Sequence, residues 1–245
     1  MPKNRDSDGR RSDLSHAIED YLKAIYELHQ GGVPVSTSAL AERLGFASAS
    51  VTGMLKKLSA HTPQLVKYRR HKGATLTATG DKIALEIIRH HRLIELYLTE
   101  ALGYSWDEVH AEAEKLEHVI SESFEDRIAT FLGDPEVDPH GEPIPTKEGR
   151  IADSVGTRLS ALLVGQVGRI TRVTDEDPEL LRYLTELGLS PRALVTVIAR
   201  APFGGPVSVQ ADGGATHVFG DQVADSVYVE LVQQNSEASN HTVDQ

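Results

Sequence analysis

The sequence contains no cysteine and no long apolar run, and each absence excludes a class of protein. Without cysteine the chain has no disulfides, no thiolate nucleophile, no zinc finger and no iron–sulfur ligation, so any metal site must use nitrogen and oxygen donors. No run of about 18 apolar residues is present to span a bilayer, and the first residues, MPKNRDSDGRRSD, lack the apolar segment of a secretory signal. We therefore expect a cytoplasmic protein with no membrane partner.

Acidic residues outnumber basic ones overall, but the two signs are unevenly distributed. The chain has 245 residues, 40% of them hydrophobic, which supports one large domain or two small ones with packed cores. Residues 1–80 hold 12 Lys and Arg against 7 Asp and Glu, a net charge of +5, whereas the remainder holds 13 against 29, a net charge of −16. A basic N-terminal part is expected if only that part meets phosphates, and random variation in surface charge is the alternative.

The first 80 residues predict a winged helix-turn-helix DNA-binding domain that follows a disordered arm, 1–13. Apolar residues with helical period predict a first helix from Ser15 to Leu28. The stretch STSALAERLGFASASVTGMLKKLS predicts two short helices around a turn at Gly45, with Ser48 as the cap of the second helix. The stretch LVKYRRHKGATLTATG then predicts a basic β-hairpin that turns at Gly73.

The second short helix should enter the major groove with its N-terminal residues nearest the bases. The residues expected there are Ala47, Ser48, Ala49, Ser50 and Thr52. These side chains are small and form no bidentate pair with a base, so much of the specificity must come from DNA shape or from water. The expected phosphate contacts are Thr37, Ser38, Lys56, Lys57, Arg69, Arg70 and Lys72. For Lys56 and Lys57 a merely solvated helix face is the alternative.

The middle of the chain predicts a helical domain over residues 81–150, with a long helix from Asp81 to Ala101 and a shorter one over 109–120, VHAEAEKLEHVI. The shorter helix carries an apolar stripe beside a face of imidazoles and carboxylates at i, i+4, i+7 and i+8: His110, Glu114, Glu117 and His118. Such a face is costly to bury unless a divalent cation neutralises it. His91 and Glu95 add a further i,i+4 pair on the long helix. The alternative is a solvated face of charge pairs.

The C-terminal part has a different character. The stretch GDPEVDPHGEPIPTKEGR predicts a loop, and we place a linker at 151–164. Residues 165–232 contain five short β-type runs, VGRITRV, ALVTVIAR, PVSVQAD, ATHVFG and DSVYVEL, with one helix, PELLRYLTELG, inserted, which predicts a small SH3-like β-barrel. Residues 233–245 are predicted to be a disordered tail. The fold class is therefore multidomain α + β: winged helix-turn-helix, all-α domain and SH3-like barrel.

Four stretches together carry a family resemblance: IEDYLKAIYEL, the helix-turn-helix, RHHRLIELYLTEALGYSWDEVHAEAEKLEHVISE and GEPIP. From about Ser15 to Leu231 the chain resembles the diphtheria-toxin-repressor family of metal-dependent transcriptional regulators, and it looks closer to the manganese-type members. The resemblance implies a homodimer with a metal-binding dimerisation domain and a FeoA-like, SH3-like C-terminal domain. It also implies repression of metal-uptake or iron-handling genes when a divalent metal is bound.

The resemblance also implies which residues bind metal. The primary site would use Asp20, Glu114, Glu117 and His118, and a second site His91, Glu95 and His110. Iron-type members have methionine and cysteine where this chain has Asp20 and Glu114. Hard oxygen donors suit Mn²⁺ and Fe²⁺, and the loss of sulfur favours Mn²⁺ relatively, although other divalent metals can substitute.

Two further positions follow from the same resemblance. Manganese-type members often carry a glutamate where this chain has Lys23, which argues against a two-manganese cluster of that kind. In full-length members the SH3-like domain can supply a ligand to the second site, and in the stretch TDEDPE the expected donor is Asp177 or Glu176.

The sequence thus predicts a Mn²⁺- or Fe²⁺-dependent DNA-binding repressor that acts as a homodimer on a pseudo-palindromic operator and has no small organic substrate. An enzyme is the competing class, but a di-iron bundle needs paired Glu-x-x-His motifs and a zinc protease needs His-Glu-x-x-His; neither motif is present. In a third interpretation the metal is structural and the C-terminal module recruits a protein partner.

Overall fold

The computed structural model describes residues 14–29, 32–154, 156–174 and 177–232. The predicted arm 1–13, the predicted tail 233–245 and Glu176 lie outside the described residues. The chain divides into two compact units, residues 1–138 with 143–152 and residues 139–142 with 153–245. Among the described helices, none combines the length and the apolar character needed to cross a membrane.

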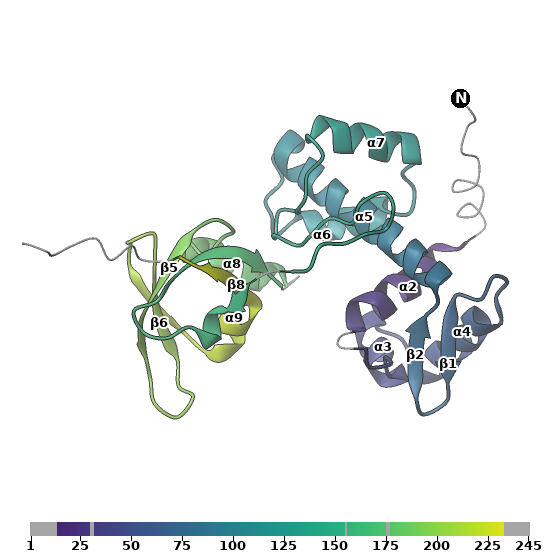
Figure 1. The fold of residues 1–245 in the computed structure, drawn as a ribbon, viewed down its shortest axis with the longest axis horizontal. Coiled ribbons are helices and arrows are strands. Elements are labelled where there is room, and N and C mark those ends of the chain that lie inside the picture. Colours follow the sequence, from purple (N-terminus) through teal and green to yellow (C-terminus); the bar gives the residue numbers. More distant parts are fainter. Residues whose placement is uncertain (1–13, 30–31, 155, 175–176, 233–245) are drawn as a thin grey trace, which may run out of the picture. The chain divides into compact units, whose positions relative to one another are not determined.

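The first unit begins with the winged helix (Figure 1). Its elements are α2 (His16–Leu28), α3 (Thr37–Leu44), α4 (Ser48–Ala60), β1 (Val66–Arg69) and β2 (Gly73–Leu76). Leu22, Leu40 and Leu55, one from each helix, are fully buried in a shared core, and burial of each such side chain contributes about 1.5–3 kcal/mol. The strands pair antiparallel with Val66 opposite Leu76.

The turn between α3 and α4 forms as predicted, but the capping residue differs. Gly45 ends α3 in the left-handed conformation, with φ of 68°, which glycine adopts without steric cost. The N-cap of α4 is Ala47, which offers no side-chain acceptor, and Ser48 is the first helical residue. The prediction that Ser48 caps this helix was therefore wrong by one position. Helix α3, in contrast, has a side-chain cap, because the hydroxyl of Ser36 accepts from the Ala39 amide.

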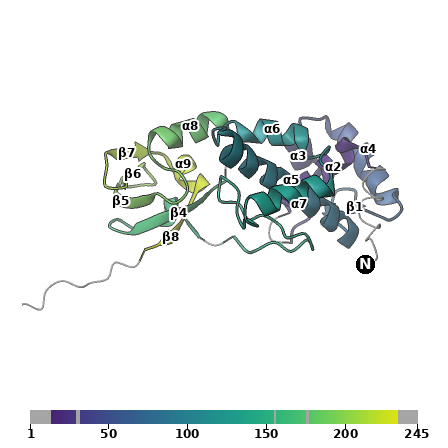
Figure 2. The ribbon, with the colours of Figure 1, turned by 90° about the horizontal axis from the view of Figure 1, so that it is seen from above.

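Three helices form the rest of this unit: α5 (Ala78–Leu102), α6 (Val109–Leu116) and α7 (Glu122–Phe131). Figures 1 and 2 show α5 between α6 and α7. Neighbouring residues on a helix point about 100° apart, so α5 can pack against two helices at once. Leu93 packs with Ile128 of α7, whereas Ile94 packs with Val109 of α6.

Two features of this helical part differ from the sequence prediction. The helix predicted over 109–120 ends at Leu116, so that Glu117 is its C-cap and His118 lies in the turn that follows. Helix α7 was not predicted separately. Its start is fixed by Ser121, whose hydroxyl accepts from the Phe124 amide. Glu117 and His118 therefore lie at the turn between α6 and α7. A single longer helix would have placed their side chains elsewhere.

The second unit contains a six-stranded antiparallel sheet in the order β3-β8-β4-β5-β6-β7. Its elements are β3 (Thr157–Arg158), the 3-10 helix η1 (Leu159–Ala161), β4 (Val167–Val173), α8 (Pro178–Glu186), β5 (Leu194–Arg200), β6 (Val207–Ala211), β7 (Thr216–Phe219), α9 (Asp221–Ser226) and β8 (Val227–Leu231). Alternate residues such as Val195, Val197, Val207 and Val209 are fully buried, the pattern of strands with one face on a core.

The five predicted strands and the inserted helix all form. Elements β3, η1 and α9 were not predicted, and the first two lie inside the stretch 151–164 that the sequence suggested as a linker. A strand of two residues carries too short an alternation to be recognised. The predicted multidomain α + β fold class is confirmed.

Candidate metal centre and DNA-binding surface

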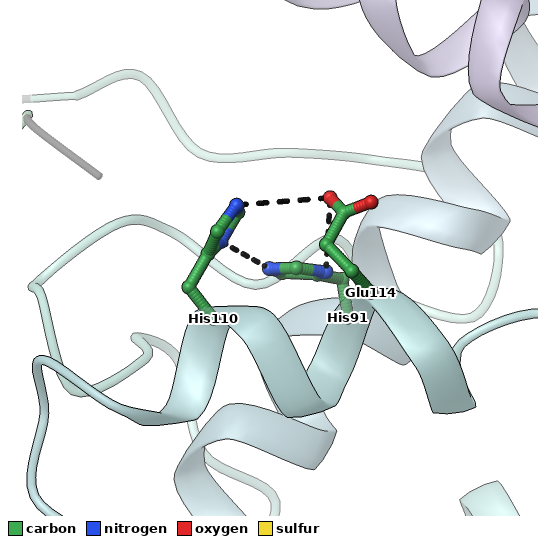
Figure 3. A group of neighbouring side chains, drawn as sticks. All are labelled: His91, His110 and Glu114. Atoms are coloured by element: carbon green, nitrogen blue, oxygen red, sulfur yellow. Dashed lines mark hydrogen bonds and ion pairs between the residues drawn. The ribbon is translucent and has the colours of Figure 1, made fainter. Parts of the chain in front are cut away.

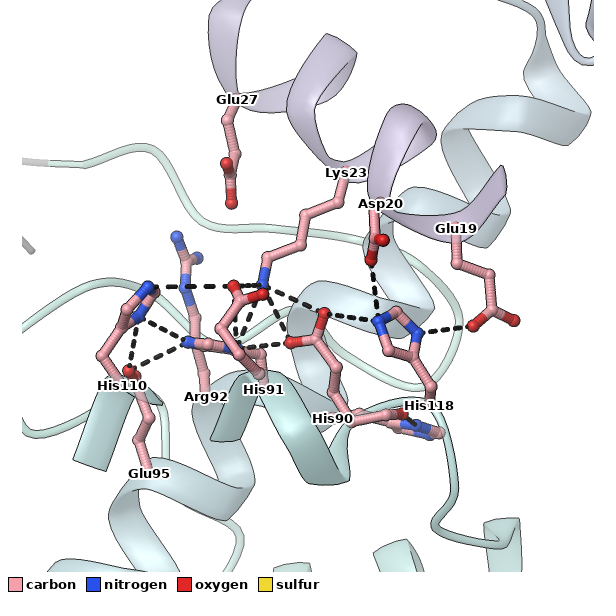
Figure 4. Close-up of polar contacts among 12 residues, drawn as sticks. Glu19, Asp20, Lys23, Glu27, His90, His91, Arg92, Glu95, His110 and His118 are labelled. Atoms are coloured by element: carbon pink, nitrogen blue, oxygen red, sulfur yellow. Dashed lines mark hydrogen bonds and ion pairs between the residues drawn. The ribbon is translucent and has the colours of Figure 1, made fainter. Parts of the chain in front are cut away.

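Polar side chains from three segments of the first unit converge on one cluster (Figure 4). Helix α2 contributes Glu19, Asp20 and Lys23; α5 contributes His91 and Glu95; α6 and the turn after it contribute His110, Glu114, Glu117 and His118. Glu19 and Lys23 are four residues apart, so they share a face of α2. The arrangement joins the first helix of the winged-helix domain to the helical domain.

The first group of candidate ligands consists of Asp20, Glu117 and His118. Nε2 of His118 lies 2.8 Å from Oδ1 of Asp20 and 3.4 Å from Oε1 of Glu117. On its other side, Nδ1 of His118 lies 2.6 Å from Oε2 of Glu19. Burial opposes the charged imidazolium, but the hydrogen bonds to Asp20 and Glu19 outweigh it and raise the pKa of His118 to about 9.

The second group consists of His91, Glu95 and His110, the three residues predicted for the second site. Nε2 of His91 lies 2.9 Å from Oε1 of Glu95 and 3.1 Å from Nδ1 of His110, and these last two atoms are 3.3 Å apart. Burial again opposes the charged imidazole, but the Glu95 carboxylate and hydrogen bonds to Glu117 and Glu95 raise the pKa of His91 to about 9.

Both groups have the dimensions of a metal site. Donor atoms that share one divalent ion at about 2.1 Å lie about 3.0–3.4 Å apart, depending on octahedral or tetrahedral geometry. The distances around His118 and within the His91, Glu95, His110 triangle fall close to this range. Carboxylate and imidazole donors without sulfur suit Mn²⁺, Fe²⁺ and Zn²⁺. The residues present therefore fit a divalent transition metal.

Glu114 is placed differently from the sequence prediction, which assigned it to the first group. Its Oε1 lies 3.8 Å from Nε2 of His110 and 4.0 Å from Nδ1 of His91 (Figure 3), so it borders the second group. The reason is an ion pair with Lys23, at 2.7 Å, which draws the Glu114 carboxylate toward the middle of the cluster. Burial raises the pKa of Glu114, but the Lys23 charge outweighs it and holds that pKa below its usual value.

Lys23 occupies the centre of the cluster. Its Nζ donates to Oε1 of Glu114 at 2.7 Å and to Oε2 of Glu117 at 2.8 Å, and it lies 3.0 Å from Nδ1 of His91, which also contacts Oε2 of Glu117. The lysine is 6% exposed, and Glu117 is fully buried. Burial alone would lower the pKa of Lys23, but Glu117 and Glu114 reverse this and raise it. The buried ammonium is thus the counterion of two carboxylates.

A second polar network supports the turn that carries Glu117 and His118. Nδ1 of His90 lies 3.1 Å from the carbonyl oxygen of Glu117, and its Nε2 lies 3.0 Å from Oε2 of Glu125 on α7. Arg89 contacts the other oxygen of Glu125. Burial raises the pKa of Glu125, but His90 and Arg89 outweigh it and lower that pKa to about 2. This network ties the turn to α5 and α7.

Sequence reasoning missed several members of these networks: Glu19, the central position of Lys23, and Arg89, His90 and Glu125 of the second network. A signal existed for the first two, because Glu19, Lys23 and Glu27 follow one another at intervals of four on a helix that also carries an apolar stripe. Glu125 had no comparable signal, since α7 itself was not predicted.

The cluster opens to solvent through a pocket of about 270 Å³ between α2, α3 and α6. Lys23, Glu27, Arg43, His110 and Glu114 are among its lining residues. Glu27 pairs with Arg43 at 3.0 Å across this pocket. An ion could therefore reach the cluster without unfolding of the surrounding helices.

The residues predicted to contact DNA lie mostly on the surface of the winged helix. Ala47, Ser48, Ala49 and Ser50 are exposed at the start of α4, whereas Val51 is fully buried. The other exposed members are Ser38, Lys56, Lys57, Arg69, Arg70 and Lys72, and two are half-buried, Thr37 and Thr52. The Thr52 hydroxyl donates to the Ser48 carbonyl at 2.9 Å. The exposed side chains are thus available to a ligand.

Asp177, the predicted donor from the SH3-like domain, has a local role in its own unit. It is the N-cap of α8, where its Oδ1 accepts from the Glu179 amide at 2.9 Å. A capping carboxylate of this kind contributes about 1 kcal/mol to helix stability. The role of Asp177 as a metal ligand stays a prediction.

Three family models match successive parts of the chain. They describe the iron dependent repressor N-terminal DNA binding domain (residues 13–74), the iron dependent repressor metal binding and dimerisation domain (77–146) and the FeoA domain (157–231). The matches fall on the winged helix, on α5 to α7 and on the six-stranded sheet. Each structural part of the chain therefore has its counterpart in a described family.

Named relatives and solved structures agree with these models. The iron-dependent repressor IdeR of Mycobacterium tuberculosis (strain ATCC 25618 / H37Rv) is 32% identical over 236 residues, covering 90% of this chain and 100% of the relative. The diphtheria toxin repressor of Corynebacterium diphtheriae is 35% identical, covering 69% and 80%. A solved manganese-dependent transcriptional repressor in complex with manganese is 38% identical, covers 88% of this chain and 100% of that chain, and has a TM-score of 0.80. The chain belongs to the family of the iron-dependent and diphtheria toxin repressors, which are transcriptional repressors and not enzymes.

Proposed function

We propose that this protein is a repressor whose binding to double-stranded DNA depends on Mn²⁺ or Fe²⁺, and that it controls genes of metal-ion uptake and homeostasis. The observation that carries the proposal is the pair of donor groups, with spacings close to those around one ion, at the junction of α2 with the helical domain. The names of the relatives support both metals, since some are iron-dependent and others manganese-dependent.

In the first group, Asp20 belongs to α2 of the winged helix, whereas Glu117 and His118 follow α6. When bound, a divalent cation supplies positive charge that both carboxylates and the imidazole can share. The three side chains then favour the arrangement of the two domains in which they converge. A ligand shifts a population only by its differential affinity for the two arrangements, and this convergence provides that difference.

The two groups differ in their donors. Asp20, Glu117 and His118 offer two carboxylates and one imidazole, a hard set that suits Mn²⁺ and Fe²⁺. His91, Glu95 and His110 offer two imidazoles and one carboxylate, a set with more affinity for late transition metals. Asp177 of the second unit is the proposed additional donor to the second group. We assign the first group as the regulatory site because it alone includes a residue of α2.

The DNA-contacting surface is the exposed start of α4 together with the basic wing. Ser48 and Ser50 would approach base edges, while Lys57, Arg69 and Arg70 would contact phosphates. A homodimer presents two such surfaces and would read a pseudo-palindromic operator in the cytoplasm.

The proposal is tested by measuring operator affinity by fluorescence anisotropy at increasing concentrations of free Mn²⁺. We expect the wild type to bind DNA much more tightly with metal, and Asp20→Asn and His118→Ala to lose this gain. His217→Ala is the matched control, because His217 lies on β7 of the other unit. Equal wild-type affinity with and without metal, or a normal metal response of His118→Ala, would refute the proposal.

A further inference from the structure

The Nζ atom of Lys23 lies between the two donor groups, and its partners are atoms of the kind that bind metal. They are carboxylate oxygens of Glu114 and Glu117 and the Nδ1 of His91, at 2.7, 2.8 and 3.0 Å. A second oxygen of Glu117 lies at 3.1 Å. Three different side chains thus surround the ammonium with nitrogen and oxygen donors, which is how they would surround an ion.

The Lys23 ammonium contacts one side chain of each donor group, Glu117 of the first and His91 of the second. Glu117 presents Oε1 to His118 at 3.4 Å while its Oε2 contacts Lys23. His91 presents Nε2 to Glu95 and His110, while its Nδ1 contacts Lys23. In Figure 4, Lys23 reaches from α2 to a point between His91 and His118. The ammonium therefore stands where a carboxylate-bridged second ion would otherwise be coordinated beside the first.

Displacement of this ammonium is unfavourable. The Lys23 side chain is 7% exposed, and its removal from Glu117 would take a buried cationic partner away from a fully buried carboxylate. A surface lysine would simply swing away from an incoming ion, but this side chain is buried and is held by its hydrogen bonds to Glu114 and Glu117.

We propose that Lys23 is a built-in cation that holds the centre of the cluster and keeps bound divalent ions apart, with one on either side and no carboxylate-bridged pair. The inference rests on the proposed function for the two flanking groups. Lys23 also repels those ions, because like charges within a few ångströms interact strongly in a shielded site. It thereby limits how tightly the protein holds its metal.

The test counts Mn²⁺ per full-length chain by calorimetry and by metal analysis, and records the Mn²⁺ electron paramagnetic resonance spectrum. We expect the wild type to show only isolated ions. Lys23→Glu should bind one additional Mn²⁺ per chain, and its spectrum should change to that of an exchange-coupled pair. Lys23→Arg keeps the charge and should match the wild-type count and spectrum.

A second variant covers the case in which Lys23→Glu fails to fold, as judged by circular dichroism and thermal unfolding. Lys23→Met keeps the length of the side chain and removes the charge, so its Mn²⁺ affinity should rise at least about tenfold. The inference is overturned by a coupled pair in the wild type, by a folded Lys23→Glu with wild-type count and spectrum, or by unchanged affinity in Lys23→Met. Absence of any Mn²⁺ binding by the wild type would instead refute the proposed function itself.

Discussion

The Nζ atom of Lys23 lies 2.8 Å from Oε2 of Glu117, and the two side chains are 7% and 0% exposed. This ion pair connects α2 to the end of α6 without any bound ligand. Buried pairs of this kind contribute little net stability, but removal of one partner is costly because the other is left charged and unpaired. The metal-free protein therefore depends on the charge balance at the centre of the cluster.

Glu117→Gln should lower the free energy of unfolding of the metal-free protein by about 2–4 kcal/mol, because Lys23 loses its most buried counterion. Urea unfolding followed by the fluorescence of Trp106, the single tryptophan, reports on the first unit. The control is Glu112→Gln, which removes an exposed pair with Lys115 and should cost under about 0.5 kcal/mol. Equal effects of both variants would contradict this account.

Metal affinity should rise with pH between about 7 and 9. Hydrogen bonds and neighbouring carboxylates raise the pKa of His91 and of His118 to about 9 in the metal-free protein, and each imidazole must lose its proton from a nitrogen that binds metal. Affinity should increase up to about tenfold per pH unit for each proton released. Calorimetry in buffers of different ionisation enthalpy counts these protons. Affinity that stays flat over this range would be inconsistent with the geometry.

The same two histidines should make the metal-free protein less stable at high pH. A raised folded pKa contributes stability that is fully present below the unfolded value of 6.5 and is lost as the pH rises through about 9. Thermal unfolding of the metal-free chain should therefore occur at lower temperature at pH 9 than at pH 6.5. His118→Gln should weaken this pH dependence, whereas His217→Gln should leave it unchanged.

Acid should destabilise the first unit through Glu125. Its pKa is lowered from 4.5 to about 2 by His90 and Arg89 against the opposing effect of burial, so its stabilising contribution is present above pH 4.5 and is lost as the pH falls toward 2. Near neutral pH we expect Glu125→Gln to be about 2–3 kcal/mol less stable than wild type, with the difference shrinking in acid. A difference that stays constant down to pH 2 would argue against this ion pair.

The proposed DNA surface predicts two kinds of variant. Arg69→Gln or Arg70→Gln should weaken binding to all DNA sequences. Each should also reduce the slope of log affinity against log salt concentration by about one, the value for one lost phosphate contact. Ser50→Ala should instead reduce discrimination between operator and altered sites, by about 1 kcal/mol. Salt titrations with operator and mutated operator separate these effects. Lys115→Gln, on the exposed face of α6, is the control for loss of a distant positive charge.

Gly80, in the first turn of α5, should tolerate no side chain. A Cβ at this position would lie 2.2 Å from the carbonyl oxygen of Leu65, so Gly80→Ala must separate α5 from the wing. We expect a loss of about 2–3 kcal/mol in urea unfolding. Gly53, inside α4, has open space around its Cβ position, and Gly53→Ala should gain up to about 1 kcal/mol from helix propensity. Similar values for both would contradict the packing argument.

The sequence predicted the fold well where periodic patterns are long. The helix-turn-helix, the long helix and the five main strands were all visible in it, because local pattern and tertiary role agree there. The grouping of His91, Glu95 and His110 was implied by the family resemblance. The structure brings His118 together with Asp20 and Glu117, as the resemblance implies, but His118 lies in the turn after α6 and not on the predicted helix. The burial of Lys23 was not predicted, because a lysine is stable inside only when distant carboxylates reach it, and its local spacing with Glu19 and Glu27 does not reveal those distant contacts.

Helix α5 starts directly after the wing and ends at Leu102, and its 25 residues pack against two parts of the first unit. Ala84 lies in the core of the winged helix, whereas Leu93 packs with α7 and Ile94 packs with α6. At 1.5 Å per residue this is a rod of about 37 Å. No flexible tether therefore separates the two parts along this route. Any change of angle between these two parts must come from bending of α5 or from sliding of α2 across it. A ligand that acts on α2 therefore needs to move only one helix to change the orientation of the whole winged helix.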